Sequence, residues 1–250
     1  MRELEDHYWW FVSRRSMAHA WLKEFAPEGK TLDLGCGTGA LLQTLQSERE
    51  AEGVDFSPLA LEFCQSRGLK NLHEADAQSL PLPDSSFQAV VTLDTLEHVP
   101  DDEMAMREIC RVLEPGGILI INVPAFQWLW GPHDVALHHF RRYTPRLLKK
   151  RLEEAGFRVV RLSCGVFFLF PVVVAIRLME KLNRRKPEVR LPSVPPWLNR
   201  LLLKVMEVEV KLMSFVPLPW GSSVCAVAMR DPVRAPLGAA SAEVKDGGNA

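Results

Sequence analysis

Three glycines at alternate positions lie where they could bring the backbone close to a ligand. Gly35, Gly37 and Gly39 follow a short apolar strand pattern and precede an apolar helix pattern. Glycine tolerates backbone angles that other residues avoid, so such a loop can approach a bound molecule closely. The free N–H groups and the positive dipole end of the following helix face the same place. This arrangement is typical of a nucleotide site.

Three aspartates mark the ends of the first three predicted strands. Asp33 lies within the first strand, Asp55 ends the second and Asp76 follows the third. Because the carboxyl ends of parallel strands line one crevice in an open α/β sheet, we expect these acids to share one edge. Three acids without a phosphate-binding lysine favour a cationic ligand that carries a ribose and an adenine. A dinucleotide loop is similar, but its spacing is GxGxxG, whereas this loop has GxGxG.

Short apolar runs that alternate with helical patterns predict a mostly parallel α/β sheet of seven strands with helices on both faces. We expect residues 1–230 to form one domain, in which residues 1–29 are an N-terminal helical cover. A tail of Pro, Ala, Gly and charged residues at 231–250 is expected to be disordered. The expected strands lie near 30–35, 50–55, 71–75, 87–93, 117–123, 157–162 and 223–229, and the expected helices near 39–47, 57–67, 101–113 and 144–155. Residues 114–117 are expected to end a helix and turn into the fifth strand.

An apolar insertion at residues 165–221 precedes the last strand. Its two helical segments, 166–176 and 197–215, flank a cluster of cations that includes Arg177, Lys181, Arg184 and Arg185. Two interpretations remain open: the helices pack on each other as a lid over the site, or they dip into a bilayer interface where the cations meet anionic headgroups. No apolar run reaches the roughly 20 residues that a spanning helix needs.

Composition excludes some partners and compartments. The net charge of −1 gives no global field toward nucleic acid, so a nucleic-acid partner is disfavoured. Five cysteines without CxxC pairs and an N-terminus without an apolar signal segment indicate a cytoplasmic protein. Peripheral association with the inner face of the membrane is the open alternative, and the oligomeric state is not predicted.

Five motifs in order resemble the class I S-adenosylmethionine-dependent methyltransferases, particularly the small-molecule group that includes ubiquinone-biosynthesis enzymes. They are LDLGCGTG at 32–39, GVDFS at 53–57, EADAQSLPLPDSSFQAVV at 74–91, LEHVPD at 96–101 and RVLEPGGILIINVP at 111–124. The resemblance implies a Rossmann-like fold and S-adenosylmethionine as the methyl donor.

The resemblance also implies roles for individual residues. The methionine part of the cofactor would lie along Gly35, Gly37 and Gly39, with Cys36 and Leu93 also in its site. Asp33 would hold the amino group through water, and Asp55 would accept from the ribose hydroxyls. The adenine would lie under Phe56, and its amino group would donate to Asp76 beside the backbone of Ala77.

Purely structural alternatives remain open for three of these residues. Asp33 could cap a turn, Asp55 could cap the helix after it, and Phe56 could belong to the core.

Three histidines are candidates for the base that removes a proton from the methyl acceptor. Methyl transfer is an in-line displacement, in which the protein positions the nucleophile and takes its proton. An imidazole titrates near neutrality and suits a hydroxyl. His139, His138 and His98 are the candidates in that order, which favours an oxygen of a small or lipid-like acceptor. Alternatively, His138 and His139 cap a loop, and Arg141 and Arg142, which could otherwise bind an acid on the acceptor, begin a solvated helix.

A metal ion is not favoured, although one set of residues could hold it. Asp94, Glu97 and His98 stand at i, i+3 and i+4, on one side of a helical turn. Some O-methyltransferases look similar there and bind magnesium, but usually with Glu in place of Asp94, so Mg²⁺ stays an optional cofactor. Two rival functions also stay open: a catalytically silent, membrane-peripheral S-adenosylmethionine-binding protein, and an NAD-dependent oxidoreductase.

Overall fold

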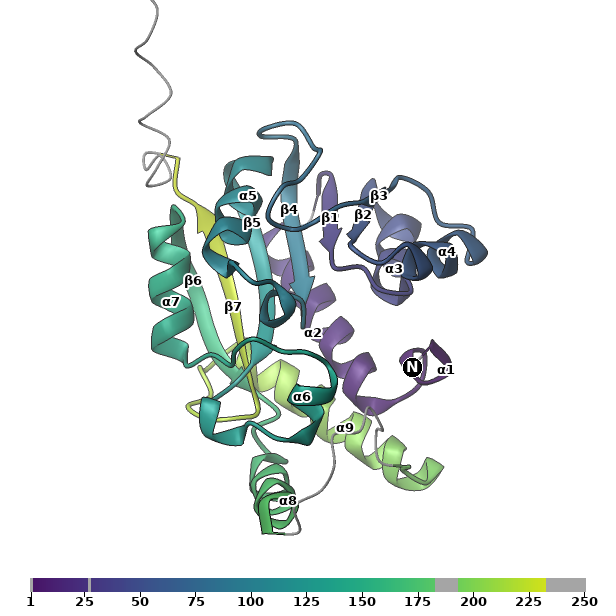
Figure 1. Cartoon of the computed structure of the whole chain (residues 1–250), viewed down its shortest axis with the longest axis vertical. Coiled ribbons are helices and arrows are strands. Elements are labelled where there is room, and N and C mark those ends of the chain that lie inside the picture. Colours follow the sequence, from purple (N-terminus) through teal and green to yellow (C-terminus); the bar gives the residue numbers. More distant parts are fainter. Residues whose placement is uncertain (1, 27, 183–192, 233–250) are drawn as a thin grey trace, which may run out of the picture.

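A seven-stranded sheet forms the middle layer of the protein, with helices on both faces (Figure 1). The computed structural model describes residues 2–26, 28–182 and 193–232. The strand order is β3-β2-β1-β4-β5-β7-β6; the first five strands run parallel, and β7 is antiparallel to both neighbours. This confirms the predicted fold class. The strands are β1 (Thr31–Leu34), β2 (Ala51–Asp55), β3 (Leu72–Glu74), β4 (Phe87–Leu93), β5 (Leu113–Pro124), β6 (Phe157–Gly165) and β7 (Ser223–Arg230).

Local capping residues set where several helices begin. Ser57, Asp101 and Thr144 accept hydrogen bonds from backbone N–H groups three residues later, and proline follows Ser57 and Thr144 directly. The helices are α1 (Arg2–Glu5), α2 (Trp9–Phe25), α3 (Ala40–Glu48), α4 (Pro58–Ser66), α5 (Asp102–Val112), α6 (Pro132–Ala136), α7 (Pro145–Glu154), α8 (Phe170–Leu182) and α9 (Pro196–Met213), with 3-10 turns η1 (Leu96–His98) and η2 (Gln127–Leu129).

Alternate strand residues build two cores, one on each face of the sheet. On β5, Leu119 and Ile121 pack with α5 and α7, whereas Ile118 and Ile120 pack on the side of α2, α3, α4 and α9. Strands buried on both faces explain the continuous apolar runs in the sequence.

The expected turn at 114–117 is an irregularity within β5 instead. Phe87 pairs with Leu113, and Ala89 already pairs with Ile118, so the intervening residues bulge out of the ladder. Gly116 takes a φ of 82° there. The glycines that predicted a turn therefore serve a bulge that keeps the chain in the sheet.

The N-terminal cover is a core element, and the insertion splits into two differently placed helices. Trp21 and Leu22 of α2 are fully buried against the sheet. α9 packs along α2, and its Met206, Val210 and Met213 are buried. α8, by contrast, buries no side chain and projects away from the sheet (Figure 1). The expectation that the two insertion helices pack mainly on each other is therefore wrong, because α2 is the partner of α9.

Membrane-spanning helices and the C-terminal tail can be judged only for the residues that the structure describes. Within residues 2–26, 28–182 and 193–232, no helix is long and apolar enough to cross a membrane. Most of the tail expected to be disordered, from residue 233 onward, lies outside the described residues.

A buried tyrosine joins the loop before α7 to the start of α5, and its loss should destabilise the fold. Tyr143 is fully buried, and its hydroxyl donates to Asp102 at 2.8 Å. Replacing Tyr143 by Phe leaves a buried carboxylate oxygen without this donor, which should lower the free energy of unfolding by about 1–3 kcal/mol. Urea denaturation measures it. Ser47→Ala, which removes an exposed hydroxyl bonded at 2.7 Å, should cost less than about 0.5 kcal/mol. Equal midpoints for Y143F and the wild type would contradict this assignment.

Candidate functional site

The glycine loop between β1 and α3 has a left-handed backbone at all three glycines. The φ angles are 76° at Gly35, 54° at Gly37 and 86° at Gly39. A Cβ atom at Gly35 would lie 2.2 Å from Thr95 Oγ1, and one at Gly39 would lie 2.5 Å from a methyl carbon of Leu69. At Gly37 it would meet nothing within 4 Å. Gly35 and Gly39 are thus required by packing, whereas Gly37 borders open space that a ligand could occupy.

Asp33 and Asp55 lie on adjacent parallel strands beside this loop. Asp33 is 3% exposed, and one of its carboxylate oxygens has no hydrogen-bond partner within the described part of the chain. Burial, together with the nearby charge of Asp55, raises the pKa of Asp33 to about 7. A buried acid with an unused oxygen is a place that a cationic group would stabilise.

Asp55 reaches across the loop instead of capping α4. Its carboxylate accepts from the backbone N–H of Gly37 at 2.8 Å and of Ser57 at 2.9 Å. The Ser57 side chain caps α4 by accepting from the N–H of Ala60. Ser57, and not Asp55, therefore caps α4, and the Asp55 carboxylate lies at the glycine loop.

The other expected cofactor residues gather at the same edge of the sheet, after β1 to β4. Phe56 is 76% exposed, which removes the core alternative for its ring. Asp76 accepts from the backbone and the side-chain amide of Gln78, each at 2.9 Å. Ala77 and Cys36 are buried, and Leu93 is half-buried at the end of β4.

A short N-terminal segment covers the glycine loop through contacts that the expected N-terminal cover did not specify. Glu5, at the end of α1, accepts from the hydroxyl of Thr38 in the loop. The guanidinium of Arg67, which ends α4, approaches the Asp6 carboxylate at 3.3 Å. These contacts join residues far apart in the sequence, so no local pattern could have indicated them.

A buried aspartate orients His139. Asp134 of α6 is fully buried and accepts from Arg142 at 2.8 and 3.0 Å and from the backbone of Gly131 at 2.8 Å. His139 Nδ1 lies 2.9 Å from the same carboxylate. Burial alone would raise the pKa of Asp134, but the hydrogen bonds from His139 and Arg142 outweigh it and hold the pKa well below its usual range. Asp134 is thus an anion that fixes the His139 ring through Nδ1.

His98 and Glu97 lie beside His139. The His98 and His139 rings meet edge to face, with centroids 4.5 Å apart. Partial burial and the neighbouring His139 lower the pKa of His98. Glu97 is buried, and burial with the nearby Asp94 raises its pKa well above the usual value. His138 is exposed with a left-handed backbone, φ 54°. The structure brings two of the three candidate histidines together.

The metal set that the sequence offered without favouring it is not assembled. Asp94 pairs with Arg14 and accepts from Asn122 at 2.8 Å, so its carboxylate is engaged elsewhere. Ligand atoms of Glu97, His98 and His139 do lie within 4.8 Å of one another. Two imidazoles and one carboxylate suit a borderline ion such as zinc better than magnesium, which prefers oxygen ligands. These residues therefore do not fit the magnesium ion considered from the sequence.

Both arginines of the 141–142 pair serve the loop itself. Arg141 donates to the backbone carbonyls of Leu96, Val99 and Pro100, and Arg142 binds Asp134. They hold the loop against η1, in place of the expected contact with an acid on the acceptor.

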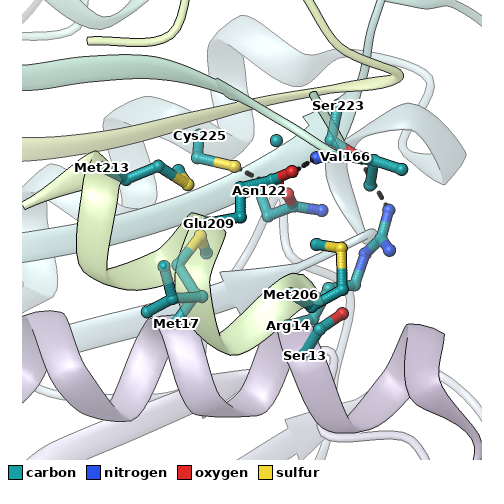
Figure 2. Close-up of a pocket in the computed structure, with 12 residues that line it drawn as sticks. Ser13, Arg14, Met17, Asn122, Val166, Met206, Glu209, Met213, Ser223 and Cys225 are labelled. Carbon is teal, nitrogen blue, oxygen red and sulfur yellow. Dashed lines mark hydrogen bonds between the residues drawn. The ribbon is translucent and has the colours of Figure 1, made fainter. Parts of the chain in front are cut away.

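A cavity lies between α2, α9 and strands β5 and β7 (Figure 2). Arg14 enters it from α2, is 7% exposed, donates to Ser223 at 2.8 Å and lies 3.7 Å from the centre of the Trp10 ring. Its Nη1 has no hydrogen-bond partner among the residues that the structure describes. The rest of the lining combines apolar side chains, among them Met17, Met206, Val210, Met213 and Cys225, with the polar side chains of Ser13, Asn122, Glu209 and Ser223.

Comparison with known proteins places a methyltransferase domain over residues 32–121. A probable S-adenosylmethionine-dependent methyltransferase of Mycolicibacterium smegmatis is 28% identical over 167 residues, 65% of this chain and 64% of the relative. The demethylmenaquinone methyltransferase of Geobacillus stearothermophilus is 35% identical over 138 residues, 50% of this chain and 59% of the relative. The chain thus matches less than two thirds of the length of these relatives.

Solved structures show the same fold. An S-adenosylmethionine-dependent methyltransferase from Thermotoga maritima has 21% identity and a TM-score of 0.58, covering 89% of this chain and 93% of that one. A chain from the complex of a Haloferax volcanii methyltransferase with its activator Trm112 has 17% identity and a TM-score of 0.60, covering 92% and 93%. At these identities the likeness concerns the fold alone.

The strand order separates this fold from the dinucleotide-binding one. In the NAD-binding arrangement, strands follow the order 3-2-1-4-5-6. Here the antiparallel β7 lies between β5 and β6, and the relatives reported above do not support the oxidoreductase alternative. Sheet order, the matched domain at 32–121 and the relatives agree with the five motifs. Residues 32–121 thus match a methyltransferase domain, and the chain is similar to S-adenosylmethionine-dependent methyltransferases.

Proposed function

We propose that this protein transfers the methyl group of S-adenosylmethionine to an oxygen of a small or lipid-like acceptor. The observation that carries the proposal is the pairing of His139 with the buried Asp134 anion at 2.9 Å. That pairing directs Nδ1 inward and leaves Nε2 to accept a hydroxyl proton, which is what an oxygen acceptor requires. His98, in edge-to-face contact with His139, also packs against this ring.

The donor would lie along the glycine loop. Bound S-adenosylmethionine supplies an electrophilic methyl group on a sulfonium sulfur. Asp55 would accept from the ribose hydroxyls, Asp33 would stabilise the cationic amino group through water, and Asp76 with Ala77 would hold the adenine under Phe56. Gly35, Cys36, Gly37, Gly39 and Leu93 would line the methionine part. The open space at Gly37 and the unused oxygen of Asp33 support this placement.

Removing the Asp55 carboxylate should weaken donor binding. Asp55→Ala takes away the acceptor for two hydroxyl groups, so we expect the dissociation constant for S-adenosylmethionine to rise about 10- to 100-fold. Isothermal titration calorimetry measures it. Glu62→Ala, which removes an exposed acid from α4, is the control and should bind as the wild type does. Undiminished affinity in a folded D55A protein would refute the ribose role.

The relatives named demethylmenaquinone methyltransferase make transfer to a ring carbon the second candidate.

Labelled S-adenosylmethionine identifies the acceptor class. The methyl-labelled donor is incubated with the purified protein and a cell extract, which is then partitioned between lipid and aqueous phases. Label in the lipid phase, released by cleavage of a methyl ether, is the expected result. Label that resists ether cleavage would favour carbon transfer. A protein that binds the donor but releases no S-adenosylhomocysteine with any extract would be the catalytically silent alternative.

A further inference from the structure

Helix α8 has its polar and apolar sides reversed relative to an ordinary surface helix. The side chains of Val172, Ile176, Met179 and Leu182 are between 39% and 82% exposed. The charged side chains of Arg177 and Glu180 are only 16% and 18% exposed, and they pair with each other at 2.8 Å. A helix that faced water would present the charges and bury the aliphatic groups.

Specific contacts fix this orientation. Lys181 Nζ donates to the backbone carbonyl of Trp128 at 2.7 Å, and the ring of Phe170 lies 6.0 Å from that of Trp128. Arg177 lies against Gly131, where an added Cβ would come within 2.7 Å of Nη1. The polar side of α8 therefore docks on the 126–131 segment, and its apolar side points outward.

Aromatic side chains extend the apolar surface beyond the helix. Phe168 and Trp220 are exposed, and both contact Phe167: Trp220 stacks on it with centroids 5.5 Å apart, and Phe168 meets it at 5.3 Å. Trp128 is exposed as well, and its backbone carbonyl accepts from Lys181. We call the outward side chains of α8 together with Trp128, Phe168 and Trp220 the outer patch. Exposed apolar groups gathered in this way mark an interaction surface.

The excess of positive charge in residues 165–221 favours a negatively charged partner. Residues 165–221 contain nine Lys and Arg against four Asp and Glu, whereas the whole chain carries a net charge of −1. Lys181 is exposed at the end of α8. An anionic bilayer offers both an apolar interior for aliphatic groups and negative headgroups for cations, and tryptophan prefers its interface.

We infer that the outer patch docks on the surface of an anionic lipid bilayer, with α8 lying in the plane of the interface. Through Arg177 and Gly131, α8 adjoins the loop that carries Asp134 and His139. A molecule dissolved in the bilayer would then be close to the proposed base. The docking itself does not depend on the transfer chemistry.

Vesicle co-sedimentation of the full chain tests this inference. We expect binding to vesicles of phosphatidylcholine with phosphatidylglycerol, weaker binding to phosphatidylcholine alone, and further weakening in high salt. The double variant I176E/M179E should lower the partition coefficient about tenfold or more, since two carboxylates must enter the interface. M104E/V160E places the same charges at exposed apolar positions of α5 and β6 and should bind as the wild type does.

Three results would overturn the inference: no binding of the wild type to anionic vesicles, unchanged binding of I176E/M179E, or self-association in analytical ultracentrifugation that I176E/M179E abolishes, which would make a second copy the occupant. L182E, at the most exposed apolar position of α8, repeats the test with less risk to folding. Calorimetry with S-adenosylmethionine should give wild-type affinity for every variant, so failure of docking and failure of the donor site are distinguishable.

Discussion

Replacing His139 by alanine should lower kcat about 10²- to 10⁴-fold, the usual range for loss of a general base. Donor binding should stay within about twofold of the wild type, because His139 contacts the Asp134 carboxylate and the His98 ring and not the glycine loop. The measurement is the initial rate of S-adenosylhomocysteine release at saturating donor, with the acceptor fraction identified as above. Asp134 acts through His139 as a positioning residue, so Asp134→Asn should shift the pH profile of kcat as well as lower its maximum.

His138 provides the matched control for His139. It is the adjacent histidine, it is exposed, and His138→Ala should change kcat less than about threefold. If H138A lost activity and H139A kept it, the base would be His138. A metal role for His139 gives a different signature: activity lost in EDTA and regained with zinc or manganese would make His139 a ligand beside Glu97 and His98, and not the base.

Replacing Asp33 by asparagine should stabilise the protein at neutral and alkaline pH. The pKa of Asp33 is about 7 in the folded chain against an ordinary 3.8, because burial and Asp55 disfavour its charged form. Between these values the folded state holds a proton that the unfolded state has lost, so the stability of the wild type falls as pH rises from about 4 to about 7. Asparagine does not titrate. The difference in unfolding free energy between D33N and the wild type should therefore grow by about 4 kcal/mol from pH 4 to pH 8.

Denaturant titrations across this pH range measure the difference. A cationic group bound beside Asp33 should also lower its pKa. Donor binding near pH 6.5 should then release a proton, detectable as a dependence of the binding enthalpy on the buffer, and this dependence should vanish in D33N. A D33N difference that stays constant with pH would contradict the assignment.

Features that depend on neighbours in the chain could be predicted from the sequence. Glycines at 35, 37 and 39 required positive φ angles, and the caps at Ser57 and Thr144 lie directly before their helices. The sheet followed from apolar runs whose residues are buried on both faces. Asp33 and Asp55 could be placed together because parallel strands end at one edge.

Contacts between residues that are distant in the sequence could not be predicted. Asp94 pairs with Arg14 of α2, a choice that only the packing of α2 on the sheet determines. The apolar period of α8 indicated a helix but not which side faces the protein, since the period is the same for either orientation. Asp134 and His139 could be identified as polar residues in the sequence. Their pairing, however, depends on the fold, in which the Asp134 carboxylate is also bound by Arg142 and by the backbone of Gly131.

The insertion of β7 between β5 and β6 has a consequence for synthesis on the ribosome. β5 and β6 each pair with β7, which lies between them. The residues of β7, 223–230, are translated long after β5 at 113–124. Until those residues emerge, one edge of β5 in the middle of the sheet is open to non-native pairing. The polypeptide must therefore acquire β7 before β5 and β6 can be joined in one sheet.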